Sequence, residues 1–139
     1  MVSNTQIKSK SESNDKIVLA DIYDENINIA IWNRNLSKEL SQSVQNYITK
    51  NASLSTLSVI VSPTDAHKLL NQELPEFIGK ESLATDIANL VDMFCYLFEL
   101  KQAGLRLAII NKAMCPRFHV DHVPCRLVTC YSGGGNRLA

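Results

Sequence analysis

A histidine and an aspartate stand two residues apart near the end of the chain, at His119 and Asp121. The surrounding segment, Phe118 to Val123, has the residue types of a strand, and residues two apart on a strand project from the same face. An imidazole and a carboxylate on one face are two of the three ligands of a 2-His-1-carboxylate site, which holds Fe(II). The spacing therefore predicts a metal site at His119 and Asp121.

Cysteines and a second histidine close to this pair support another interpretation. Cys115, His119, His122 and Cys125 form the pattern C-x3-H-x2-H-x2-C. Thiolate and imidazole are the ligands that Zn(II) prefers, although this spacing matches no common structural zinc module. A zinc-binding module is thus one alternative, and a metal-free remnant or interaction domain is another.

The composition is that of one globular domain. The chain has 139 residues, 45% of them hydrophobic and 20% charged, and its 14 basic and 14 acidic residues cancel. This balance predicts no nucleic acid partner, and the absence of a long apolar stretch predicts no membrane partner. Residues 1–16 are polar and lack the apolar core of a secretion signal, so we expect a disordered tail and a cytoplasmic protein. Residues 17–132 are predicted to be the domain, and the glycine-rich residues 133–139 a flexible C-terminal tail.

Hydrophobic periodicity predicts helices in the first two thirds of the chain. A strand over Ile27–Trp32 is followed by an amphipathic helix from Leu36 to Asn51, and then by a buried strand over Leu54–Val61. Thr64 is expected to cap a short helix that ends near Pro75. The strongest helical pattern runs from Lys80 to Gln102, with Gly104 placed to terminate it.

Strands dominate the rest of the sequence. Leu105–Ile110, Phe118–Val123 and Arg126–Tyr131 have alternating or β-branched patterns, separated by turn-forming residues. The sequence therefore predicts an α+β fold, in which N-terminal helices and a long buried helix pack on a sheet formed by the later strands.

The run P-R-F-H-x-D-x-V-P-x-R-L, from Pro116 to Leu127, resembles the hallmark region of an uncharacterised bacterial family, domain of unknown function 1826. More distantly, H-x-D followed by R-L-V-T-x-Y is similar to the core of Fe(II)/2-oxoglutarate oxygenases. That resemblance implies a double-stranded β-helix, also called a jelly-roll or cupin-like sheet. It also implies that His119 and Asp121 bind the metal, Fe(II) or Zn(II), and that Arg117, Arg126 and Tyr131 line the site.

The resemblance further implies that the chain is truncated at its C-terminus. Where the family continues with a G-P-G-T-E-W-L-like stretch, this chain has Gly133-Gly134-Gly135 and ends at Ala139. A later histidine and arginine, which in the oxygenases complete the metal site and hold the co-substrate, have no counterpart. We therefore expect an incomplete jelly roll without enzymatic activity or 2-oxoglutarate binding. Its unpaired sheet edges would favour self-association or a protein partner.

Overall fold

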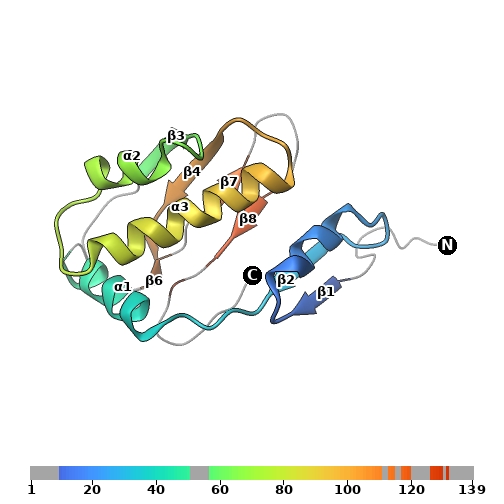
Figure 1. The fold of residues 1–139 in the computed structure, drawn as a ribbon. Helices are drawn as coiled ribbons and strands as arrows, with labels where there is room; N and C mark the ends of the chain where they lie inside the picture. Colours follow the sequence, from blue (N-terminus) through green and yellow to red (C-terminus); the bar gives the residue numbers. More distant parts are fainter. Residues whose placement is uncertain are drawn as a thin grey trace. The chain divides into compact units, whose positions relative to one another are not determined.

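The computed structural model describes residues 10–50, 57–110, 113–114, 117–119, 126–129 and 131. They divide into two compact units, one reaching to Asn35 and the other beginning at Leu36. Each unit combines helical and extended segments (Figure 1). None of the helices in these ranges is long and apolar enough to cross a membrane.

The first unit contains β1 (Lys10–Ser13), η1 (Lys16–Tyr23, a 3-10 helix) and β2 (Ile29–Trp32). The two strands pair in parallel, with Lys10 opposite Ile29 and Ser13 opposite Trp32. Asp15 caps η1, because its carboxylate accepts a hydrogen bond of 3.0 Å from the Ile17 amide.

Two features of this unit differ from the sequence predictions. The expected tail over residues 1–16 contains β1, whose polar residues K-S-E-S carry no apolar alternation by which a strand could be recognised. The strand forms instead through backbone pairing with β2, and the Asn33 side chain adds a 2.8 Å hydrogen bond to Glu12. The helix η1 was not predicted either. The strand expected at Ile27–Trp32 is confirmed as β2.

Three α-helices belong to the second unit: α1 (Lys38–Lys50), α2 (Ala66–Glu73) and α3 (Lys80–Leu97). All three predicted helices are therefore confirmed in type. The apolar stripe expected on α1 is buried, and the Ser37 hydroxyl accepts a hydrogen bond of 3.0 Å from the Leu40 amide at the start of that helix. In α2 the residue before the helix is Asp65, and its side chain makes no capping hydrogen bond.

The end of α3 differs from the prediction. The helix stops at Leu97 rather than Gln102, and Gly104 lies in a strand instead of terminating it. Glu99 adopts the left-handed conformation, with φ 54°. The amide of Glu99 donates to the Tyr96 carbonyl and the amide of Leu100 to the Cys95 carbonyl, at 3.3 and 2.8 Å. These two bonds define a Schellman motif, in which the left-handed residue is usually glycine. The sequence did not predict this end of α3, because glutamate is not the residue typical of the left-handed position.

Four antiparallel strands form the main sheet, in the order β3-β4-β7-β8. They are β3 (Leu57–Val61), β4 (Ala103–Leu107), β7 (Arg117–His119) and β8 (Arg126–Val128). A separate hairpin, β5 (Ile109–Ile110) with β6 (Ala113–Met114), lies between β4 and β7 in the sequence. Each predicted strand of this region is thus confirmed over part of its length. The segment predicted as one strand over 105–110 is divided between β4 and β5.

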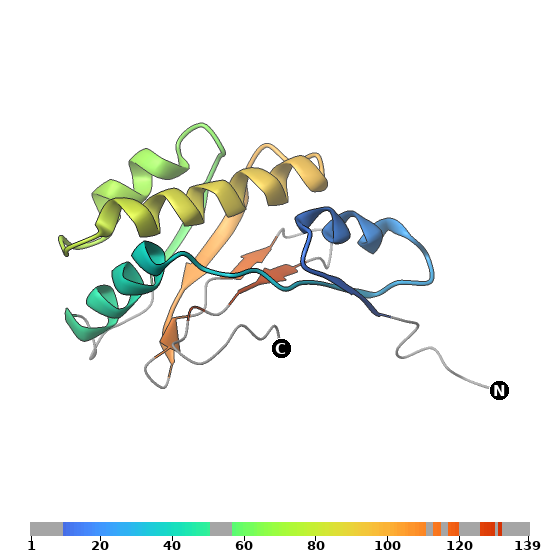
Figure 2. The same ribbon diagram turned by 60° about the horizontal axis from the view of Figure 1, so that its bottom comes forward.

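The two faces of the main sheet have opposite character. Val61, Ala103, Leu105 and Leu107 are each at most 2% exposed, and they alternate along β3 and β4 with exposed or half-buried residues. Figures 1 and 2 show α1, α2 and α3 together on one side of the sheet. The buried positions belong to that side, because successive residues of a strand face opposite ways. We call the other side, which carries Ser58, Ile60 and Arg106, the open face.

The predicted α+β class agrees with this mixture of helices and strands. The finer prediction, a jelly-roll or cupin-like sheet, is not confirmed. Among the described residues, helices rather than a second sheet cover the buried side of β3 and β4. The other domain boundaries stay predictions.

Replacing Gly79 by alanine is expected to lower the free energy of unfolding by about 1–3 kcal/mol. Gly79 has φ +91°, and a Cβ there would lie 3.1 Å from Cβ of Ser43 on α1. The strained backbone and this close contact would both destabilise the alanine variant. Chemical denaturation measures the change, with Asn89→Ala, at an exposed position of α3, as a control expected to stay within about 0.5 kcal/mol. Equal stability of the two variants would contradict the packing described.

Glu99→Gly is expected to raise the free energy of unfolding by about 0.5–1 kcal/mol, since relief of the left-handed strain exceeds the entropic cost of glycine. Thermal and urea denaturation measure the gain. Lys101→Gly is the matched control, because Lys101 is exposed and has no positive φ. That variant should lose stability. Similar losses in both variants would show that residue 99 is not strained.

Candidate functional site

The predicted metal ligand His119 lies in the main sheet, at the last described position of β7. The pairing places it directly opposite Gly104 of β4 on one side and opposite Arg126 of β8 on the other. Directly opposite residues of antiparallel strands share a face of the sheet. Ile60 lies opposite Gly104 on β3, and its side chain is 65% exposed. The row Ile60–Gly104–His119–Arg126 therefore belongs to the open face.

Gly104 has a role at this position that sequence reasoning missed. It was expected to end the long helix, but the register makes it the β4 neighbour of His119. Glycine has no side chain, so nothing projects from β4 into the space beside residue 119 on the open face. A glycine within a strand often marks such a place, where another group approaches closely.

The other predicted ligands lie outside the described residues. These are Asp121, the second member of the H-x-D pair, and the alternative zinc ligands Cys115, His122 and Cys125. Both metal sites therefore stay predictions. Within the ranges that the structure describes, no group of three or more histidine, cysteine, aspartate or glutamate residues is arranged to hold a metal ion.

Two arginines predicted to line the site occupy neighbouring rows of the open face. Arg126 is exposed and lies in the row of His119. Arg117 occupies the next row, directly opposite Arg106 of β4. Arg106 is also exposed, and sequence reasoning missed it because it stands in the alternating strand pattern, away from the H-x-D run. The sequence pattern could have indicated it, because Arg106 alternates with the apolar Leu105 and Leu107 and so belongs to the opposite face of the strand.

Tyr131, the third predicted lining residue, is placed differently. Its side chain is completely buried, and its hydroxyl donates a hydrogen bond to the carboxylate of Asp86 on α3. Since α3 covers the buried side of the sheet, this contact does not bring Tyr131 together with the exposed Arg126. The tyrosine joins the last described part of the chain to the middle of the long helix.

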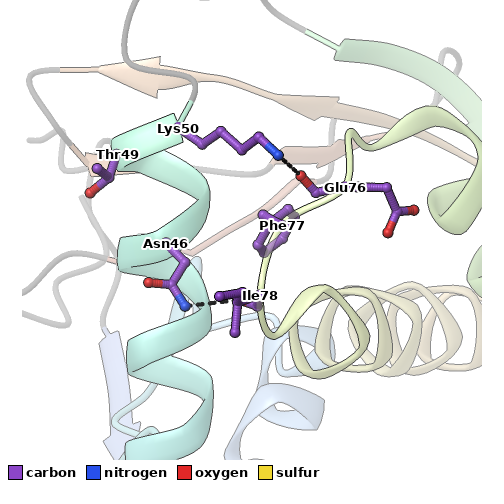
Figure 3. Close-up of a pocket in the computed structure, with 6 residues that line it drawn as sticks. All are labelled: Asn46, Thr49, Lys50, Glu76, Phe77 and Ile78. Carbon is purple, nitrogen blue, oxygen red and sulfur yellow. Dashed lines mark hydrogen bonds between the residues drawn. The ribbon is translucent and has the colours of Figure 1, made fainter.

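A shallow pocket of about 520 Å³ lies at the end of α1, between Asn46 and Lys50 on the helix and Glu76, Phe77 and Ile78 in the loop before α3 (Figure 3). Two of its polar side chains bind the backbone of the loop. Asn46 donates to the Ile78 carbonyl at 2.8 Å, and the Lys50 ammonium donates to the Glu76 carbonyl. Both bonds hold the loop against α1, so the pocket is better explained as part of the packing than as a ligand site.

Lys80 strengthens the same junction at the start of α3. Its side chain is largely buried, and its ammonium donates to the Asn71 carbonyl at 2.7 Å and to the Glu76 carboxylate at 2.9 Å. The hydrogen bond and the charge of Lys80 lower the pKa of Glu76. The stabilisation of the fold by this ion pair is therefore present at pH values above the usual carboxyl pKa. It is lost as the pH falls through the lowered pKa of Glu76.

Cys95 has a structural role in the core. It lies on α3, is 2% exposed and is not in a disulfide. Burial, assisted by the negative charge of Asp92, raises the pKa of its thiol. The thiol thus stays protonated at neutral pH and acts as a small apolar side chain in the core.

The sequence profile of a family described as protein of unknown function (DUF1826) matches residues 13–138. The chain belongs to this family, which confirms the resemblance carried by the P-R-F-H-x-D run. Comparisons with curated proteins and with solved structures gave no match. The similarity to oxygenases and the truncated C-terminus stay predictions.

Tyr131→Phe is expected to lower the free energy of unfolding by about 1–3 kcal/mol, because the buried hydroxyl donates to a carboxylate. The matched control is Tyr96→Phe, which removes the same atom from a side chain that is 85% exposed on α3. Urea denaturation followed by circular dichroism compares the two. If both variants lose the same stability, the contact between Tyr131 and Asp86 is not a stabilising one.

Proposed function

We propose that this protein binds a transition-metal ion through His119 and Asp121, as a non-haem metal-binding domain. One observation carries the proposal: residue 119 lies on the open face of the sheet, between a glycine and an exposed arginine. A ligand in this position would have a residue without a side chain on one side and a cationic neighbour on the other. The H-x-D spacing supplies the second ligand on the same face, if β7 continues to residue 121.

The chemistry of the two ligands favours Fe(II) or Zn(II). Imidazole and carboxylate suit both ions, and two protein ligands leave coordination positions for water or another small molecule. The resemblance to oxygenases makes Fe(II) the first ion to test. On the same resemblance, we propose that the main sheet is related to the jelly roll of those enzymes. The guanidinium of Arg126 would bind the carboxylate of a molecule held at the metal, since arginine pairs with carboxylates in bidentate fashion. Self-association through the sheet edges, β3 and β8 among the described strands, also stays a proposal.

The test is metal binding by the whole chain. Metal-depleted protein is titrated with Fe(II) without oxygen, and separately with Zn(II), and the bound metal is counted by elemental analysis. We expect one equivalent in the wild type and a loss of affinity of at least about tenfold in His119→Ala and in Asp121→Asn, since changing even an outer partner of a ligand has an effect of that size. Two matched controls, His67→Ala on α2 and Asp92→Asn on α3, should bind as the wild type does.

Cys115→Ser and Cys125→Ser separate the two metal sites. If these variants lose Zn(II) while Asp121→Asn keeps it, the site is the zinc-binding module with Cys115, His119, His122 and Cys125, and the proposal made here is wrong. Wild-type protein that binds neither ion, or that keeps its metal in His119→Ala, also rejects it.

A further inference from the structure

The helices cover β8 less completely than they cover β4. β8 is a strand of three residues, and β7 is its only partner among the described strands. Leu127 shares a row with Leu105 and therefore belongs to the helix side, yet it is only half-buried while Leu105 is 1% exposed. A short ladder with few buried contacts is typical of a segment that opens locally while the rest of the domain stays folded.

The chain becomes completely buried again at Tyr131, three residues after β8. Its side chain is 0% exposed, whereas Val128 and Thr129 are half-buried and Arg126 is exposed. The Tyr131 hydroxyl donates a hydrogen bond to the carboxylate of Asp86 on α3. A buried aromatic ring and a hydrogen bond to a charged group both stabilise strongly. Tyr131 therefore fastens the chain that follows β8 to the long helix.

The hairpin fastened in this way carries the candidate site. β8 pairs with β7 so that Arg126 lies opposite His119, and the segment 120–125, which contains Asp121, joins these two residues in the sequence. On its other side β7 pairs with β4. Separation of β8 from β7 would leave β7 in the sheet. It would move Arg126, and the chain that leads to it from Asp121, away from His119.

We propose that Tyr131 and Asp86 form a latch that holds β8 on the sheet and thereby keeps the proposed metal site assembled. Tyr131 acts on the site through β8, from the other side of the sheet, and is a positioning residue. The latch is a property of the metal-free chain, whereas its coupling to the metal rests on the proposed function. Coupling between two such events is reciprocal, so an ion that binds only the closed hairpin also holds the latch closed.

Hydrogen exchange of the metal-free full chain tests the latch. In the wild type, we expect the amides of residues 126–131 to exchange faster than those of β4, through local opening. Tyr131→Phe should speed their exchange at least about tenfold, the change that corresponds to one hydrogen bond to a charged group. Adding Tyr131→Phe to Asp86→Ala should have little further effect, because the two side chains act through one contact.

Gly79→Ala is the matched control, because Gly79 contacts α1 and its replacement destabilises the domain away from Tyr131. This variant should speed the exchange of β4, which requires global unfolding, and leave that of residues 126–131 unchanged. Three results would overturn the latch. They are equal exchange of residues 126–131 and β4 in the wild type, unchanged exchange in Tyr131→Phe, and full additivity of Tyr131→Phe with Asp86→Ala.

The coupling to the metal has a separate readout. Fe(II) without oxygen, at about a hundred times its Kd, should slow the exchange of residues 126–131 about a hundredfold in the wild type, because binding favours the closed form by mass action. His119→Ala should show no slowing. Metal that binds the wild type without changing this exchange would disprove the coupling. A wild type that binds no metal contradicts the proposed function instead, and exchange of the metal-free protein still decides the latch.

Discussion

The register between β4 and β7 is the constraint on which the second unit depends. It pairs Leu105 with Phe118 and Arg106 with Arg117. A strand has a period of two, so sliding β7 by one residue would exchange the residues that belong to its two faces. Leu105 and Leu107, each 1% exposed, fix which side of β4 faces the helices. The register fixes which residues share a row with His119, so the pairing of β4 with β7 determines the composition of the candidate site.

The long helix α3 supports this sheet and is fixed at both ends by unusual backbone positions. At its start, Gly79 allows α1 to approach closely, and the Ser43 hydroxyl donates to the Gly79 carbonyl at 2.6 Å. At its end, Glu99 turns the chain into β4 through a left-handed conformation. Between these points the helix buries a wide apolar face that includes Leu83, Ile87 and Phe94. Both ends therefore set the position of the helix along the sheet.

The sequence allowed the prediction of elements whose pattern is amphipathic or strongly apolar. The stripe on α1 and the apolar face of α3 were recognised because burial requires that periodicity. The strand β1, built from K-S-E-S, and the left-handed Glu99 were missed because backbone pairing and tertiary context, rather than side-chain pattern, determine them. For the candidate site, the spacing of His119 and Asp121 could be found in the sequence. The register that adds Gly104 and Arg106 could not, because it joins strands separated by many residues.

The order of the strands also has a consequence for how the chain folds. β3 lies before α2 and α3, whereas its antiparallel partner β4 follows them. The two helices contact each other and need only a short loop to meet, whereas the β3–β4 pairing closes a segment that includes both. Closing a longer loop has a larger entropic cost, and proteins with many such distant pairings fold more slowly. Edge strand β3 therefore gains its only described sheet partner late in synthesis, after both intervening helices have left the ribosome.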